Sequence, residues 1–136
     1  MNFEEIQPKR YLYHMTDVKN LESISQHGMT PKINKPLSPL SPEANDKKPK
    51  TFFLPNLTSI GKKSFIDEWW HGSVEDIRLL RVSADTVKGL MKSNGHYYAK
   101  QEVWTHHPVH QDHIYLNVGG FNGPYKWVKL VKRTDI

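Results

Sequence analysis

The chain of 136 residues is long enough for one domain, over 1–136, with a normal hydrophobic core. It has no cysteine, which excludes a disulfide framework and thiolate metal sites, and no apolar run near the ~18 residues of a membrane-spanning helix. Its 19 Lys and Arg exceed 14 Asp and Glu, and the net charge of +5 favours phosphate-bearing partners. The acidic segment 1–5 lacks the features of a secretory signal, so we expect a cytoplasmic protein without a membrane partner.

The segment Tyr11-Leu-Tyr-His-Met-Thr16 predicts a short strand over 11–15 that carries His14 near its end. Thr16 or Asp17 can cap a helix, because both side chains accept hydrogen bonds from free backbone N–H groups. Gly28 is a typical residue just beyond a helix C-terminus. Three apolar residues follow helical spacing and should pack on a sheet: Val18, Leu21 and Ile24.

The rest of the chain predicts strands in runs with few helices, which favours an α+β domain. Residues 31–50 contain five prolines and form a Pro-rich loop, long enough to be a lid. A helix is expected over 56–70, and a short helix is expected from Ser83 through Met91. The expected strands are 51–54, 77–82, 101–105, 114–118 and 126–131.

The ordered set of segments resembles the ADP-ribosyltransferase superfamily, and within it the DarT-type enzymes, which modify DNA bases. The resemblance covers roughly residues 10–118 and depends on the order Tyr-His-x-Thr strand, helix, glycine, Phe-Phe strand, Leu-Leu-Arg-Val strand and Gln-Glu-Val strand. It implies an ADP-ribosyltransferase-like fold, in which two small antiparallel or mixed sheets form a cleft with short flanking helices. It also implies NAD as a substrate and no metal.

The resemblance gives residues around His14 and Glu102 their roles. The family breaks the bond between nicotinamide and ribose in NAD, and positive charge develops on the ribose. Glu102 would stabilise that charge and activate the acceptor, as a nearby carboxylate can. His14 would bind a ribose hydroxyl, the backbone of Met15 the nicotinamide amide, and Thr16 the adenosine side.

Other expected cofactor contacts are aromatic or cationic. Phe52 or Phe53, together with Phe65, matches the pair of rings that sandwiches nicotinamide, where many family members have tyrosine. No arginine matches the phosphate-binding position of DarT-type enzymes. Lysines of the Pro-rich loop, Lys48 and Lys50 above all, would take this place as point charges.

The implied activity is transfer of ADP-ribose to a nucleic-acid or protein acceptor. Such domains act as toxins or in conflict between phage and bacterium, which implies an antitoxin or immunity protein as a partner. Two alternatives stay open at this point. One is a catalytically inactive module of the same fold that binds NAD, another nucleotide or a nucleic acid; the other is an RNA 2′-phosphotransferase-like enzyme, which prefers several arginines.

Structural explanations compete with each functional one. His14 can be a core histidine bonded to backbone, and Glu102 can be a solvated strand residue. One of Phe52 and Phe53 must face the core, because successive side chains of a strand alternate. The segment 106–113 has four histidines and Asp112, which is compatible with zinc but also with a solvated loop near the glutamate.

Overall fold

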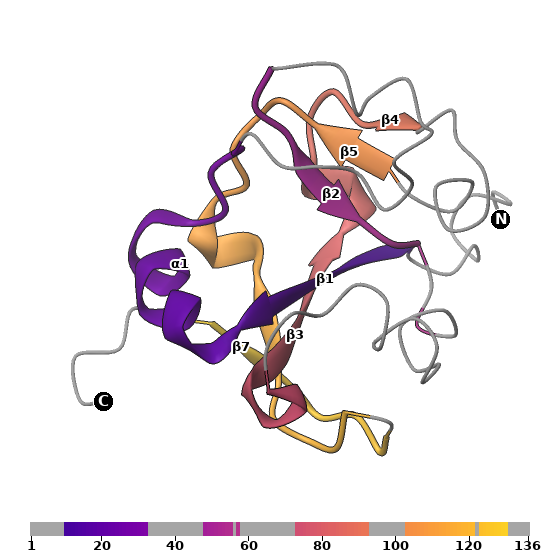
Figure 1. Cartoon of the computed structure of the whole chain (residues 1–136). Helices are drawn as coiled ribbons and strands as arrows, with labels where there is room; N and C mark the ends of the chain where they lie inside the picture. Colours follow the sequence, from indigo (N-terminus) through magenta and orange to yellow (C-terminus); the bar gives the residue numbers. More distant parts are fainter. Residues whose placement is uncertain are drawn as a thin grey trace, which may run out of the picture.

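A four-stranded antiparallel sheet is the larger of two sheets in this computed structural model (Figure 1), which describes residues 10–32, 48–55, 57, 73–92, 103–121 and 123–130. Its strand order is β1-β3-β6-β7. The smaller sheet has the order β2-β5-β4 and is also antiparallel. The strands of the larger sheet are β1 (Tyr11–Asp17), β3 (Ile77–Ser83), β6 (Tyr115–Asn117) and β7 (Trp127–Lys129), and those of the smaller one are β2 (Thr51–Phe53), β4 (Met91–Lys92) and β5 (Val103–Thr105).

In the part of the chain that the structure describes, two antiparallel sheets are accompanied by a few short helices, so the prediction of an α+β domain is confirmed. The single α-helix in the described part of the chain is α1 (Leu21–His27), and short 3₁₀ turns join the strands. These turns are η2 (Val18–Asn20), η4 (Val74–Asp76), η5 (Ala84–Thr86) and η7 (Gln111–His113). No helix among the described residues is both long and apolar enough to cross a membrane.

The segment after β1 follows the expected order of cap, helix and glycine. The side chain of Asp17 accepts a hydrogen bond of 2.9 Å from the backbone N–H of Lys19, which begins the 3₁₀ turn. Gly28 ends α1 at φ 74° and donates its N–H to the carbonyl of Ile24. Leu21 and Ile24 pack against the core as expected.

The prediction of a helix from Ser83 through Met91 is wrong. Only Ala84–Thr86 form a 3₁₀ turn, and Val87 is already extended. Val87 is buried in the core, and Gly89 turns the chain at φ 61°, so that Met91 pairs with Trp104 as a strand. Core burial of a β-branched residue and a strand pairing therefore override the helical pattern. The expected helix 56–70 lies outside the described residues, apart from Leu57.

The main core lies on one face of the larger sheet. Residues directly opposite each other in neighbouring strands share a face, and His14 lies opposite Leu80, which in turn lies opposite Leu116. This face packs against α1, the second sheet and the segment before β6. The buried residues of this cluster are Leu12, Met29, Phe53, Leu80, Val82, Val87, Val103, Val109, Ile114, Leu116 and Leu130.

Isolated bridges tie the two sheets and the ends of the Pro-rich loop together. Tyr13 and Leu54 exchange two backbone hydrogen bonds of 2.9 Å, which connects β1 with the end of β2 (Figure 1). Lys32 and Lys50 exchange bonds of 3.0 and 2.8 Å and so close the base of the loop, of which 33–47 lie outside the described residues. The chain after α1 is thereby held beside the start of β2.

Gly28 is a position where alanine should destabilise the fold strongly. Its φ of 74° and ψ of −168° belong to a region that is essentially restricted to glycine, and a Cβ would collide with the carbonyl oxygen of Val109. We expect Gly28→Ala to lower the free energy of unfolding by about 2–4 kcal/mol, measured by urea denaturation.

Gly123→Ala is the matched control. Gly123 also has a positive φ, of 97°, but the nearest atom to its added Cβ is 3.9 Å away, on the ring of Tyr125. We expect it to cost only about 1 kcal/mol. Equal losses in the two variants would show that the contact with Val109 does not constrain the turn.

Candidate functional site

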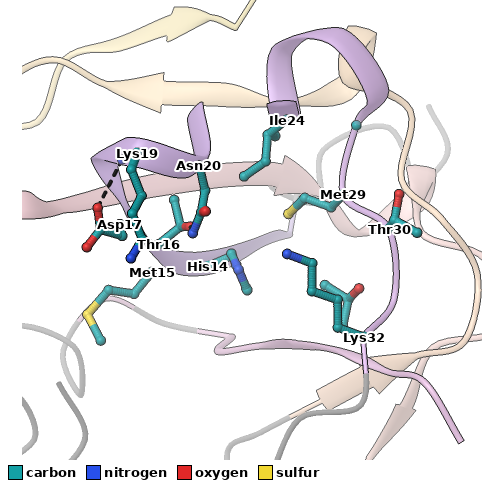
Figure 2. A pocket seen from close by; sticks show the side chains of 12 residues that line it. His14, Met15, Thr16, Asp17, Lys19, Asn20, Ile24, Met29, Thr30 and Lys32 are labelled. Carbon is teal, nitrogen blue, oxygen red and sulfur yellow. Dashed lines mark hydrogen bonds between the residues drawn. The ribbon is translucent and has the colours of Figure 1, made fainter. Parts of the chain in front are cut away.

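A pocket of ≈ 430 Å³ lies where the end of β1 meets the chain after α1 and the start of β2. This volume is within the range of small-molecule sites in proteins. Its wall combines polar and cationic groups with a few apolar ones (Figure 2). The lining residues are His14, Met15, Thr16, Asp17, Lys19, Asn20, Ile24, Gly28, Met29, Thr30, Lys32 and Thr51.

His14 is held in one tautomer by the second sheet. Its Nδ1 lies 2.8 Å from the backbone carbonyl oxygen of Phe52. A carbonyl only accepts, so Nδ1 carries the proton and donates it to Phe52. In the neutral ring Nε2 is then an acceptor with a free lone pair. The ring of Phe53 packs edge-on against the imidazole at a centroid distance of 5.9 Å, which further restricts its orientation.

The surroundings of His14 keep the ring neutral. Burial lowers the pKa of His14 below its ordinary value of 6.5, because the charged form loses more hydration than the neutral form. The bond to Phe52 acts in the opposite direction, and the positive charge of Lys32 lowers the pKa further. At neutral pH the imidazole can therefore accept a hydrogen bond from a ligand hydroxyl through Nε2.

The other polar groups of the wall are cations, hydroxyls, the Asn20 amide and the carboxylate of Asp17, which accepts from the backbone N–H of Lys19. Figure 2 shows the Lys32 side chain extending toward His14, below Met29. Thr16 is buried, and its hydroxyl accepts a bond of 3.2 Å from the amide of Asn20. Together with Lys19, these groups make a site suited to a ligand that carries both hydroxyl and anionic groups.

The structure brings part of the expected site together. His14, Met15 and Thr16 all line the pocket. Neither Phe52 nor Phe53 lines the pocket: Phe52 contributes its carbonyl to His14, and the side chain of Phe53 belongs to the main core and is only 2% exposed. This agrees with the expectation that one of the two rings faces the core.

Lys50 lies in an unexpected place for a phosphate contact. Its side chain is 1% exposed, its Nζ donates to the carbonyl of Lys48 at 3.2 Å, and it lies 5.2 Å from the ring centroid of Trp104. Neither Lys48 nor Lys50 lines the pocket. Lys32, the partner of Lys50 in the backbone bridge, lines it instead.

Glu102 and Phe65 lie outside the described residues. The residue that follows Glu102, however, is well placed within the second sheet. Val103 begins β5 and pairs with Phe53, next to the Phe52 carbonyl that holds His14. Val103, which follows Glu102 in the sequence, therefore lies in the strand that pairs with β2, and β2 carries the Phe52 carbonyl that accepts from His14.

The histidines of 106–113 have separate structural contacts. His106 bonds the carbonyl of Pro49 through Nδ1 at 2.7 Å, and Nδ1 of His110 accepts from the backbone N–H of Asp112 at 3.1 Å. In the described part of the chain, no group of three or more His, Asp or Glu side chains is arranged to hold a metal ion. Local backbone contacts thus account for these two rings.

A second pocket, of ≈ 480 Å³, lies around the start of β3 and the turn after β6. Its cation is Arg78, which donates to the carbonyls of Glu75 at 2.7 Å and Ile77 at 2.9 Å. The guanidinium of Arg78 therefore forms hydrogen bonds to backbone carbonyls of its own turn. The pocket at His14 has the stronger chemical signature, because it places an imidazole acceptor beside cations.

Sequence reasoning did not single out several residues of the pocket at His14. Asn20, Thr30 and Thr51 are ordinary polar residues, and no local pattern marks them. One feature of the sequence could have indicated Lys32 as a pocket residue: it comes soon after Gly28, which ends the helix. Its selection over the other loop lysines requires the pairing with Lys50, which is a tertiary contact.

Comparisons with models of protein families, with curated proteins and with solved structures returned no match to this chain. The resemblance described above therefore remains a prediction.

The lowered pKa of His14 makes stability depend on pH. In the unfolded chain the ring has its ordinary pKa of 6.5, so below that pH the unfolded state binds a proton that the native state does not. Stability is complete above the unfolded pKa and falls as the pH drops from 6.5 toward the folded pKa. We expect urea unfolding to show less of this loss between about pH 7.5 and 5 in His14→Asn, which does not titrate there.

His113→Asn is the matched control, since it removes a histidine from the exposed turn η7. It should keep the pH dependence of the wild type. If His14→Asn keeps it as well, His14 is not held neutral by the fold.

Proposed function

We propose that the protein is an NAD-dependent ADP-ribosyltransferase of the DarT-like type, with an ADP-ribosyltransferase-like fold, that transfers ADP-ribose to a nucleic-acid or protein acceptor. The observation that carries the proposal is the neutral His14, whose Nδ1–H is engaged by Phe52 and whose Nε2 is an acceptor at a polar, cationic pocket. A ribose hydroxyl is a donor that fits this nitrogen.

The arrangement of the sheets supports this choice. In the proposed fold, two antiparallel sheets contribute to one NAD cleft, with the histidine on one sheet and the glutamate next to the other. Here β1 carries His14, and β2 meets β1 through the Tyr13–Leu54 bridge. The strand β5, which Glu102 directly precedes in sequence, pairs with β2.

In this proposal, each pocket residue contacts a different part of NAD. His14 binds a ribose hydroxyl, the backbone of Met15 binds the nicotinamide amide, and Thr16 faces the adenosine side. Lys32 and Lys19 supply positive charge to the diphosphate, in place of the arginine of DarT-type enzymes. Phe65 stacks on nicotinamide, because Phe52 does not line the pocket, while Phe53 positions His14 from the core.

The reaction breaks the bond between C1′ of the ribose and the nicotinamide nitrogen, and the electron pair leaves with neutral nicotinamide. Positive charge then develops on the ribose, where the carboxylate of Glu102 stabilises it. A nucleophilic atom of the acceptor forms the new bond to C1′. Glu102 takes the proton that this atom loses, so the charges balance.

The described arginines argue for this activity over an RNA 2′-phosphotransferase-like one. Arg78 donates to backbone carbonyls, and Arg81 stacks on aromatic rings away from the pocket. Arg10 is exposed and does not line the pocket either. Among the described residues that line the pocket, a 2′-phosphate would thus meet Lys19 and Lys32 but no arginine. The role as a toxin with an antitoxin or immunity partner follows from the resemblance and belongs to this proposal.

Removal of the Glu102 carboxylate should abolish most turnover. We expect Glu102→Ala to reduce nicotinamide release from NAD by about 100-fold or more, in the presence of DNA, RNA or a cell extract as acceptor. Glu75→Ala, which removes an exposed carboxylate from η4, is the matched control and should retain full activity.

Three results would redirect the assignment. Release that is unaffected by Glu102→Ala contradicts the role of that residue. Calorimetric binding of NAD without release on any acceptor favours the inactive module of the same fold. Dephosphorylation of a 2′-phosphorylated RNA favours the phosphotransferase.

Lys32 should contribute to cofactor affinity. We expect Lys32→Ala to weaken NAD binding by about 5- to 10-fold in calorimetry, because it removes a cation from the pocket wall. The same change should raise the pKa of His14, followed by NMR titration, since Lys32 lowers it. Lys88→Ala removes an equal charge from an exposed turn outside the pocket, and equal effects of the two variants would contradict a specific contact.

A further inference from the structure

A row of aromatic and cationic side chains crosses the larger sheet on the face away from the main core. Tyr13 lies opposite Arg81, Arg81 opposite Tyr115, and Tyr115 opposite Lys129. Directly opposite residues share a face, so these four side chains form one line across β1, β3, β6 and β7. His14 and Leu80, one position along their strands, point to the other face.

Further rings gather around this line. The guanidinium carbon of Arg81 lies 4.1 Å from the ring centroid of Tyr11, 4.5 Å from that of Trp127 and 5.9 Å from that of Tyr115. Tyr125 stacks on Trp127 at 6.0 Å with an angle of 22°. We call the set of Tyr13, Arg81, Tyr115, Tyr125, Trp127 and Lys129 the aromatic–basic face.

Structural support of the sheet explains only part of the aromatic–basic face. Arg81 between Tyr11 and Trp127 is a cation–π contact that binds β1, β3 and β7 together. Tyr13 and Trp127 also pack against a second hydrophobic cluster, which is formed by Leu54, Ile77 and Leu79. That role does not require Tyr115 and Tyr125 to be 37% and 36% exposed, nor an exposed Lys129 beside them. Exposed aromatic rings next to exposed cations are instead typical of an interaction surface.

The charge on this sheet selects the kind of partner. Asp17 is the one acidic residue in the four strands, and it lies four positions from Tyr13 along β1. Among the described residues of these strands, the cations on this face are Arg81, at the centre of the line, and the exposed Lys129. A partner with planar groups and regularly spaced negative charges would complement both features.

We propose that the aromatic–basic face binds single-stranded nucleic acid. Unpaired bases stack on the rings of Tyr115 and Tyr125, while Lys129 contacts phosphate and Arg81 supplies positive charge at the centre. A duplex keeps its bases stacked on one another, so the rings select single strands.

This inference goes beyond the proposed function and does not rest on it, because the aromatic–basic face lies on the side of β1 opposite His14. Binding to the face needs no NAD, because Tyr13 and His14 point to opposite faces of β1. The two proposals can therefore fail separately: His14→Asn should affect NAD and leave nucleic-acid binding unchanged.

The test is fluorescence anisotropy with labelled single-stranded DNA and RNA of about 16 nucleotides, on the full chain without NAD. We expect Tyr115→Ala to weaken binding by about 5- to 100-fold and Tyr115→Phe to keep wild-type affinity, because the ring face is what stacks. Lys129→Ala should reduce the slope of log affinity against log salt by about 0.7. Circular dichroism melts verify that both exposed-site variants are folded.

Lys88→Ala is the matched control for charge, since Lys88 is exposed in a turn next to the smaller sheet. It should keep the wild-type salt slope. The proposal is overturned by wild-type affinity in Tyr115→Ala, by equal losses in Lys88→Ala and Lys129→Ala, or by a duplex binding as tightly as a single strand. Equally tight binding of polyglutamate would assign the face to an acidic protein and would also overturn it.

Discussion

The junction between β1 and β2 is the constraint on which the rest of the structure depends. Tyr13 and Leu54 join the two sheets by two backbone hydrogen bonds, and His14, the next residue, bonds the carbonyl of Phe52. This junction brings the two sheets together around the core. The bond to Phe52 fixes the tautomer of His14, and the approach of β2 to β1 places Thr51 and His14 in the wall of one pocket. A change in the register of β1 would turn His14 to the other face and remove all three effects together.

Electrostatics in the pocket follow from this junction. Because the sheets meet at His14, the imidazole is partly removed from water and stays neutral, and Lys32 beside it favours the same state. Lys32 is in turn held by the backbone bridge with Lys50, whose own side chain points toward Trp104. The pocket thus combines a neutral acceptor with a cation, a combination suited to a sugar that carries phosphate.

Alternation along β1 separates two chemical surfaces. His14 and Thr16 line the pocket, whereas Tyr11 and Tyr13 face the opposite side with Arg81. The sequence of this strand already shows the alternation: Tyr11 and Tyr13 belong to one face, and Leu12 and His14 belong to the other. Which residues of β3, β6 and β7 join each surface is decided by strand order, which local sequence does not specify.

The sequence by itself determined the local elements: a strand ending near His14, the cap at Asp17, the stop at Gly28 and the strands at 77–82 and 51–54, because caps, glycines and alternation act over a few residues. It also led to His14, Met15 and Thr16. Only the tertiary structure decided that Val87 is extended and buried, that Lys32 lines the pocket while Lys50 turns inward, and that His14 is neutral. Each of these depends on burial and on pairing with segments distant in sequence, and neither burial nor pairing is a property of local pattern.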